Sequence, residues 1–160
     1  MPDNTPYEAP PEEQPRYLIP PRRKPANDNG YFEILAQAVF QAGFSWKVVH
    51  SKWPAFRRAF NGFDIDTVAR YDIDDLERLL ADPGIVRNGQ KIEAVIHNAR
   101  AAQAIIREYG SFEAFLRSLD GLPYRERNRA ISQRFKWLGR TGAFYFLYCV
   151  DEDVPHWEDR

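Results

Sequence analysis

The chain has 160 residues, of which 44% are hydrophobic and 14% aromatic, and its formal net charge is -1. This length allows one domain with a buried core, and no apolar run is long enough to span a membrane. The single cysteine, Cys149, excludes an internal disulfide and, with no apolar leader in the sequence, predicts a cytoplasmic protein. Because the charges nearly balance, any nucleic-acid partner must be argued from local patches, such as the basic stretch from Arg125 to Arg140.

Residues 1–30 hold eight of the twelve prolines and few apolar side chains. Such a segment cannot supply a core, so we expect a flexible tail that ends in the basic run of residues 22–24. These cations can touch a phosphate backbone or keep the tail soluble, and solubility is the simpler interpretation. At the other end, residues 151–160 are predicted to form an acidic tail.

Between residues 31 and 150 the sequence has helical periodicity and almost no strand signal, which predicts a single all-α domain. Predicted helices cover residues 31–42, 45–52, 54–60, 65–71, 73–81, 91–109, 112–119, 124–134 and 139–150. Residues that cap helix N-termini precede four of them: Ser45, Asp64, Asp72 and Ser111. The last helix contains GAFYFLYCV and is expected to lie buried at the centre.

The stretch LERLLADPGIVRNGQKIEAVI predicts two helices joined by a short loop centred on Gly84 and Ile85. With a second glycine, Gly89, successive backbone N–H groups can point outward at a helix start, where the helix dipole favours an anion. Arg87 and Lys91 lie within reach of the same anion, so the loop is a candidate for gripping one DNA phosphate without reading sequence. An ordinary helix–helix turn is the alternative, and on the local pattern alone it is the simpler one.

Four segments occur in an order typical of one family: FEILAQAVFQAGFSW (32–46), AFRRAFNGFD (55–64), DLERLLADPGIVRNGQKIEAVIHNARA (75–101) and FKWLGRTGAFYF (135–146). They resemble the DNA-3-methyladenine glycosylase I family of helix–hairpin–helix glycosylases. The resemblance implies that family's fold and an enzyme that flips an alkylated purine, such as 3-methyladenine, out of DNA and hydrolyses its glycosidic bond. It also implies double-stranded DNA with alkylated bases as the partner and no cofactor, and nothing in the sequence demands more than a monomer.

The resemblance assigns roles to the QAGFSW segment. Phe44 follows the QAG glycine, where the family has the residue that plugs the gap left by the flipped base, and Gly43 would allow close approach. Trp46 matches the tryptophan that stacks on the base, where a cationic purine gains about 0.5–2 kcal/mol from a cation–π contact. Ala38 and Gln41 also stand at base-binding positions. The alternative is that Phe44 and Trp46 are both core residues of the first helix pair.

The sequence departs from the family at Ala38, where the family has a glutamate that contacts the alkylated base. Glu33 lies five residues earlier and about 140° around a helix, which makes it a poor substitute. The family's N-terminal zinc and pocket residues are absent, and Arg160 replaces a zinc-binding cysteine four residues after His156, so we expect no metal. Losing a charged base contact costs roughly 1.5–3 kcal/mol, so weak or altered activity is an open alternative and no catalytic residue is assigned.

Three other functions stay open beside the glycosylase that the resemblance favours. A non-catalytic module would use the same hairpin and wedge to recognise distorted or abasic DNA. A bifunctional lyase would use Lys91 as a Schiff-base nucleophile, although no catalytic aspartate follows at the expected distance. A protein-interaction role would rest only on the acidic C-terminus and the Pro-rich tail.

Overall fold

The computed structural model describes residues 10–11 and 21–160, and its secondary structure over these residues is helical. The elements are α1 (Asp28–Gln41), α2 (Trp46–Ala59), η2 (Asn61–Phe63), α3 (Ile65–Ala69), α4 (Ile73–Leu80), α5 (Gly89–Tyr109), α6 (Phe112–Ser118), α7 (Tyr124–Ser132), α8 (Arg140–Cys149) and η3 (Trp157–Asp159). The predicted all-α fold class is therefore confirmed. In the described part of the chain, no helix combines the length and apolar character needed to cross a membrane.

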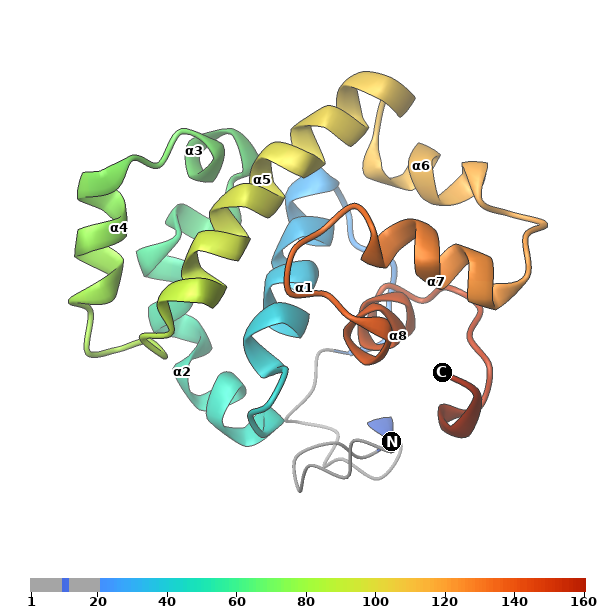
Figure 1. The fold of residues 1–160 in the computed structure, drawn as a ribbon, viewed down its shortest axis with the longest axis horizontal. Helices are drawn as coiled ribbons and strands as arrows, with labels where there is room; N and C mark the ends of the chain where they lie inside the picture. The colour runs from blue at the N-terminus through green and yellow to red at the C-terminus, as the bar shows by residue number, and fades with distance from the viewer. Residues whose placement is uncertain (1–9, 12–20) are drawn as a thin grey trace.

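The long helix α5 runs diagonally across the molecule, with α2, α3 and α4 on one side and α6, α7 and α8 on the other (Figure 1). α1 lies at the centre, where it packs against α2, α5 and α8. The α1–α2 turn and the α4–α5 loop both lie in the lower half of the view in Figure 1. Two segments far apart in sequence are thus brought to one end of the fold.

Polar caps fix the helix starts. The four predicted caps each accept a hydrogen bond from a backbone N–H two or three residues further on: Ser45, Asp64, Asp72 and Ser111. Asn27 and Asn88 do the same for α1 and α5. Side-chain caps of this kind satisfy backbone donors that the helix itself leaves free, which is why these boundaries are legible in the sequence.

The two helices predicted at 45–52 and 54–60 are one continuous helix, α2, with Pro54 in its interior. Proline has no backbone N–H and costs about 3 kcal/mol inside a helix, which is why the sequence predicts a break. Packing offsets this cost, because Trp53 and Phe56 are buried beside the proline and Trp53 stacks on Phe63 with ring centroids 5.0 Å apart. The unbroken helix presents one continuous wall to the cavity described below.

The basic run at residues 22–24 is bound to the helical body. The backbone N–H of Arg23 donates to the Cys149 carbonyl at 3.0 Å, and Lys24 forms an ion pair with Glu113. α1 begins at Asp28, before the predicted domain start. The remaining Pro-rich residues, 1–9 and 12–20, lie outside the described residues.

A buried asparagine joins α5 to the loop before α8. The side-chain amide of Asn98 donates to the Lys136 carbonyl at 3.0 Å, and its Oδ1 accepts from the Lys136 N–H at 2.7 Å. The next residue, Trp137, has a left-handed backbone with φ of 57°. This paired bond therefore sets the path by which the chain enters α8.

The Asn98→Ala variant is expected to lose about 1–3 kcal/mol in free energy of unfolding, because both backbone groups of Lys136 lose their partner. Urea denaturation followed by far-ultraviolet circular dichroism measures the change. Gln133→Ala, at an exposed position in the same connection, is the matched control and should stay within about 0.5 kcal/mol of wild type. Equal losses in the two variants would contradict the role given to Asn98.

Candidate functional site

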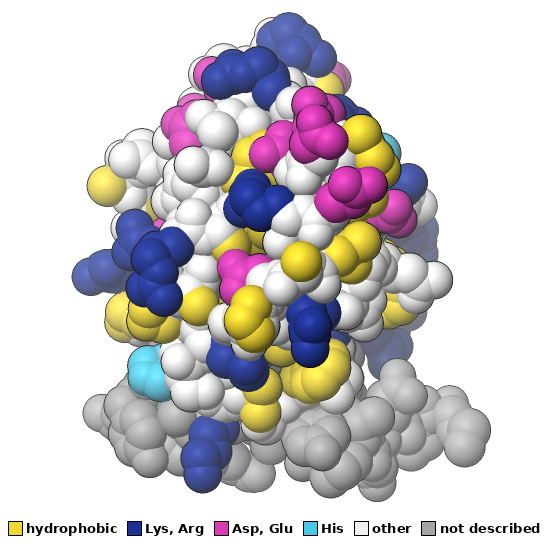
Figure 2. All heavy atoms as spheres, turned by 90° about the vertical axis from the view of Figure 1, so that its left-hand side faces the viewer, with side chains coloured by type: hydrophobic (Ala, Val, Ile, Leu, Met, Phe, Trp, Pro, Cys, Tyr) yellow, Lys and Arg dark blue, Asp and Glu magenta, His cyan; other side chains and the backbone are white. Residues whose placement is uncertain are grey.

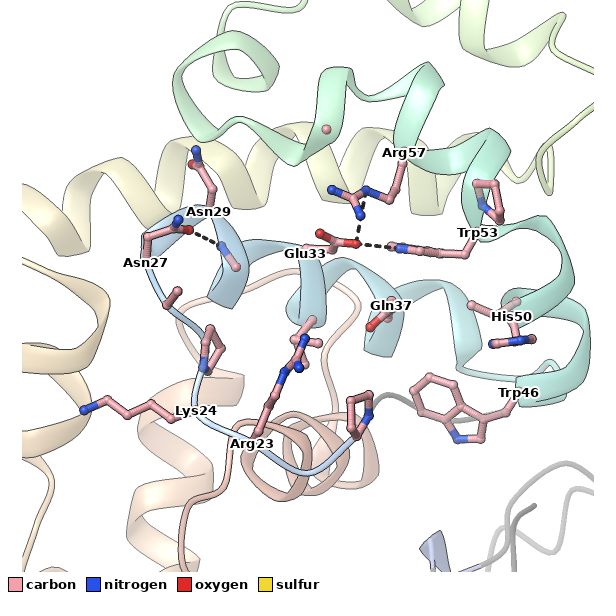
Figure 3. Close-up of a pocket in the computed structure, with 18 residues that line it drawn as sticks. Arg23, Lys24, Asn27, Asn29, Glu33, Gln37, Trp46, His50, Trp53 and Arg57 are labelled. Atoms are coloured by element: carbon pink, nitrogen blue, oxygen red, sulfur yellow. Dashed lines mark hydrogen bonds and ion pairs between the residues drawn. The ribbon is translucent and has the colours of Figure 1, made fainter. Parts of the chain in front are cut away.

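A cavity of about 1330 Å³ lies between α1, α2 and the segment of residues 21–27 (Figure 3). α1 lines it with Glu33, Ile34 and Gln37, and α2 lines it with Trp46, Val49, His50, Trp53, Pro54 and Arg57. Glu33 and Gln37 are four residues apart, so they share one face of α1. The cavity side of α1 is therefore the face that contains these two polar residues.

The predicted base-binding residues Ala38 and Gln41 lie on a different side of α1. Their side chains are 1% and 2% exposed, and neither lines the cavity. Gln41 instead donates from Nε2 to the Phe44 carbonyl at 3.2 Å, which holds the α1–α2 turn. In this structure Ala38 is a core residue and Gln41 a turn residue. A glutamate at position 38 would place a carboxylate in this interior, which is costly unless the charge is paired.

Trp46, also a predicted base-binding residue, does reach the cavity, from the first turn of α2. Its ring is 2% exposed and meets Tyr145 of α8 edge-on, with centroids 5.2 Å apart, and Trp157 packs on the same pair. The indole N–H is buried without a hydrogen-bond partner. In Figure 3 it lies on the side of the ring away from Gln37. The indole edge nearer Gln37 is thus its apolar six-membered ring.

The two polar residues on the cavity face of α1 differ in how their side chains are satisfied. The Glu33 carboxylate accepts from Trp53 Nε1 at 2.8 Å and lies 3.6 Å from Arg57 Nε. Gln37 Oε1 is buried and has no hydrogen-bond partner. Sequence reasoning missed Gln37, and it set Glu33 aside because it judged Glu33 only as a substitute for a glutamate at position 38. Only their four-residue spacing could have linked them.

The α1–α2 turn carries the predicted wedge. Gly43 is exposed with φ of 80°, and no atom lies within 4 Å of the place a Cβ would occupy. The Phe44 N–H donates to the Gln41 carbonyl at 2.7 Å, which closes the turn, and the Phe44 ring is partly exposed. The open space around Gly43 suits close approach by a large partner.

Lys91, predicted to meet a phosphate, has its ammonium turned inward. It is 2% exposed, donates to the carbonyls of Phe40 (3.1 Å) and Ala42, and lies 4.6 Å from the centre of the Phe44 ring. These carbonyls belong to the C-terminal end of α1, where the helix dipole favours a cation. The geometry corrects the expectation for this side chain, because the ammonium caps α1 and is not presented to solvent.

Burial lowers the pKa of Lys91 to about 8. A lowered pKa is one property of a Schiff-base lysine, but this amine faces two carbonyl oxygens and does not line the cavity. The lyase hypothesis therefore has no support in the geometry.

The other predicted phosphate-binding residues form the loop between α4 and α5. Gly84 donates its N–H to Asp82 Oδ1 at 2.8 Å, and a Cβ on it would stand only 3.1 Å from the Ala55 Cβ of α2. Ile85 is buried, so it anchors the loop. The glycine thus allows the loop to pack closely on α2.

The start of α5 completes the hairpin. Asn88 caps the helix by accepting from the Lys91 N–H at 3.1 Å, and Arg87 is exposed beside it. The N–H groups of Gly89 and Gln90 lie in the first helical turn, where a helix offers no internal acceptor. Free N–H groups next to an arginine are the arrangement that binds a phosphate.

Charges are unevenly distributed on the α4 side of the molecule. Figure 2 shows acidic side chains gathered in the upper half of this face. The first turn of α4 contains two acidic residues, Asp74 and Asp75. Toward the lower end, where the hairpin lies in Figure 1, Lys and Arg side chains stand among apolar ones. This lower region is the part suited to a polyanion.

The residues present do not fit the zinc site of the resembled family. His156 is exposed, and Arg160 lies with its guanidinium 3.9 Å from the centre of the Trp157 ring while its Nε donates to Thr141 Oγ1 at 3.2 Å. Within the described ranges, His, Cys, Asp and Glu form no group of three or more that would hold a metal ion.

Residues 23–139 match the methyladenine glycosylase family. The DNA-3-methyladenine glycosylase of Haemophilus influenzae is 32% identical over 147 residues, which cover 80% of each chain. DNA-3-methyladenine glycosylase 1 of Escherichia coli is 44% identical over 70 residues, which are 44% of this chain and only 37% of that enzyme.

Solved structures agree with the sequence matches. The 3-methyladenine DNA glycosylase I of Staphylococcus aureus superposes with a TM-score of 0.74 at 28% identity, over 87% of this chain and 86% of that chain. A variant of 3-methyladenine DNA glycosylase I in complex with 3-methyladenine superposes with a TM-score of 0.77 at 27% identity, over 92% of both chains.

The stability contributed by Lys91 is expected to rise with pH. Its pKa is about 8 in the folded chain and 10.5 when unperturbed, so between these values the unfolded state binds more protons and unfolding becomes harder as pH rises. From pH 7 to 9.5, wild type should gain about 2 kcal/mol relative to Lys91→Met.

Urea denaturation of both proteins at several pH values measures this difference. Lys47→Met, at an exposed position on α2, is the control and should run parallel to wild type. If the free energy of unfolding of Lys91→Met also changed with pH in parallel with wild type, the argument from burial would be refuted.

Proposed function

Because the chain belongs to the methyladenine glycosylase family, we propose that it excises N-methylated purines, 3-methyladenine among them, from double-stranded DNA. One observation carries the proposal for this chain. Lys91 of the hairpin lies against the partly exposed ring of Phe44 in the α1–α2 turn, and Trp46, two residues further on, lines the cavity. We further propose that the protein acts as a cytoplasmic monomer without a cofactor.

In the proposed complex the hairpin of Gly84, Ile85, Arg87 and Gly89 binds the DNA backbone. The main donors are the Arg87 guanidinium and the N–H groups at the start of α5, because the Gly84 N–H already donates to Asp82. Such contacts position the duplex without reading its sequence. Phe44 then fills the space left by the extruded nucleotide, and Gly43 lets the DNA approach. The flipped base enters the cavity lined by Trp46 and Gln37.

Hydrolysis of this glycosidic bond needs little protonation of the leaving base by a general acid. A 3-methylated adenine is cationic and is already a good leaving group, so catalysis consists mainly of flipping the nucleotide and binding the oxocarbenium-like transition state. Glu33 is the one carboxylate among the described residues that line the cavity, and Trp53 and Arg57 hold it. Positioning of the flipped nucleobase therefore contributes more to the reaction rate than a side chain acting as a general base.

The same observation favours a second candidate, a non-catalytic module that recognises distorted or abasic DNA. The family glutamate is replaced by buried Ala38, and the Glu33 carboxylate is already engaged. Such a module would keep the hairpin and the Phe44 wedge, and it would bind an abasic duplex more tightly than an intact one.

We expect the wild-type protein to release free 3-methyladenine from methylated DNA, measured by chromatography under single-turnover conditions. Trp46→Ala should release it about tenfold to a hundredfold more slowly, the scale of 1–3 kcal/mol for one base stacked on an aromatic ring. Trp137→Ala removes a ring that is 48% exposed and away from the cavity, so it serves as the control. Absence of release, combined with preference for abasic DNA, would instead support the non-catalytic module.

Arg87→Ala is expected to weaken binding to all DNA sequences about equally and to reduce the slope of log K against log salt by about 1, as loss of one phosphate contact should. Fluorescence anisotropy with duplex DNA between 50 and 200 mM salt, roughly the range in which such contacts dominate, measures this slope. The control, Arg107→Ala, changes an exposed arginine near the C-terminal end of α5, the helix that follows Arg87. Equal slopes for the two variants would remove Arg87 from the interface.

A further inference from the structure

Gln37 is the residue whose environment the proposed function leaves unexplained. Its Oε1 is buried and has no hydrogen-bond partner, although the side chain lines the cavity between α1 and α2. Buried polar atoms in native proteins are nearly always paired, so an unpaired one at a cavity wall needs a partner, which a bound water or a ligand can supply. Figure 3 shows the amide directed from α1 into the space between Glu33 and Trp46.

The neighbouring polar groups do not compete for this amide. Glu33, one turn earlier on α1, is held by Trp53 at 2.8 Å and by Arg57 at 3.6 Å. The unpaired N–H of Trp46 lies on the far side of its ring in Figure 3. A base entering the cavity would therefore meet the Gln37 amide as the free polar group on the α1 wall.

We propose that Gln37 reads the edge of the flipped base and sets a preference for methylated adenine over methylated guanine. This inference rests on the proposed function and deepens it. A glutamine amide offers one acceptor and one donor in a plane, which match the N6 amino group and N7 of adenine. 7-Methylguanine presents the O6 acceptor and a methyl group on N7 along the same edge, so its O6 would oppose Oε1 and N7 could not accept from the amide.

The Gln37 side chain is neutral. It can distinguish donor from acceptor on a base edge but adds no charge attraction for a cationic purine.

The test compares Gln37→Leu and Gln37→Glu with wild type and with Gln133→Leu, a control at an exposed position outside the cavity. Single-turnover release of 3-methyladenine and 7-methylguanine from methylated DNA gives the preference. Gln37→Leu should lose about tenfold to a hundredfold in 3-methyladenine release, as expected when a hydrogen bond to a charged group is lost, with little change for 7-methylguanine. Gln37→Glu keeps the acceptor and should retain more of the rate.

A binding measurement separates this inference from the proposed function. Calorimetry with free 3-methyladenine and free 7-methylguanine requires no catalysis. Binding of 3-methyladenine that depends on Gln37, without release from DNA, would overturn the enzyme function and keep the inference. Release with an unchanged preference in Gln37→Leu would keep the function and overturn the inference. If the protein neither binds nor releases either base, both fail.

Discussion

The buried ammonium of Lys91 links the two segments that the proposed function needs to act together. It donates to carbonyls at the C-terminal end of α1 and lies against the ring of Phe44, while its backbone belongs to the first turn of α5. Desolvating the ammonium is costly, as its pKa of about 8 reflects. Two carbonyls at the negative end of a helix dipole and an aromatic face offset part of that cost. A shift of the hairpin would therefore also move the wedge.

The orientation of α1 determines which side chains a base would meet. A helix turns by about 100° per residue, so positions 33 and 37 share one face while position 38 points elsewhere. In this chain the face with Glu33 and Gln37 lines the cavity, and Ala38 packs in the core. Trp46 is positioned by the Ser45 cap at the start of α2 and by Tyr145 of α8. The cavity thus depends on helices from both ends of the chain.

The helices were predictable because their signals are local. Ser45, Asp72 and Ser111 cap the helices they precede, and the hairpin loop follows from its glycines. The break expected at Pro54 failed because burial of Trp53 and Phe56 outweighs a local preference. The direction of the Lys91 side chain and the role of Gln37 were not predictable in the same way. Both depend on which tertiary neighbours surround a residue, and one sequence does not contain that information.

The charges around the cavity bear on how a base is recognised there. Three cations line it: Arg23, Lys24 and Arg57. Lys24 and Arg57 are paired with Glu113 and Glu33, which leaves Arg23 without an ion-pair partner among the described residues. Such a lining gives no net electrostatic attraction to a cationic purine, because opposite charges must outnumber like ones for that.

Discrimination must then come from short-range contacts, namely stacking on a ring and hydrogen bonds to the base edge. Trp46 and Gln37 both line the cavity and are the residues proposed to supply them. Loss of the family carboxylate at position 38 therefore need not abolish recognition. In the proposed mode of binding, selection rests on the pattern of donors and acceptors on the base edge and not on the charge of the base.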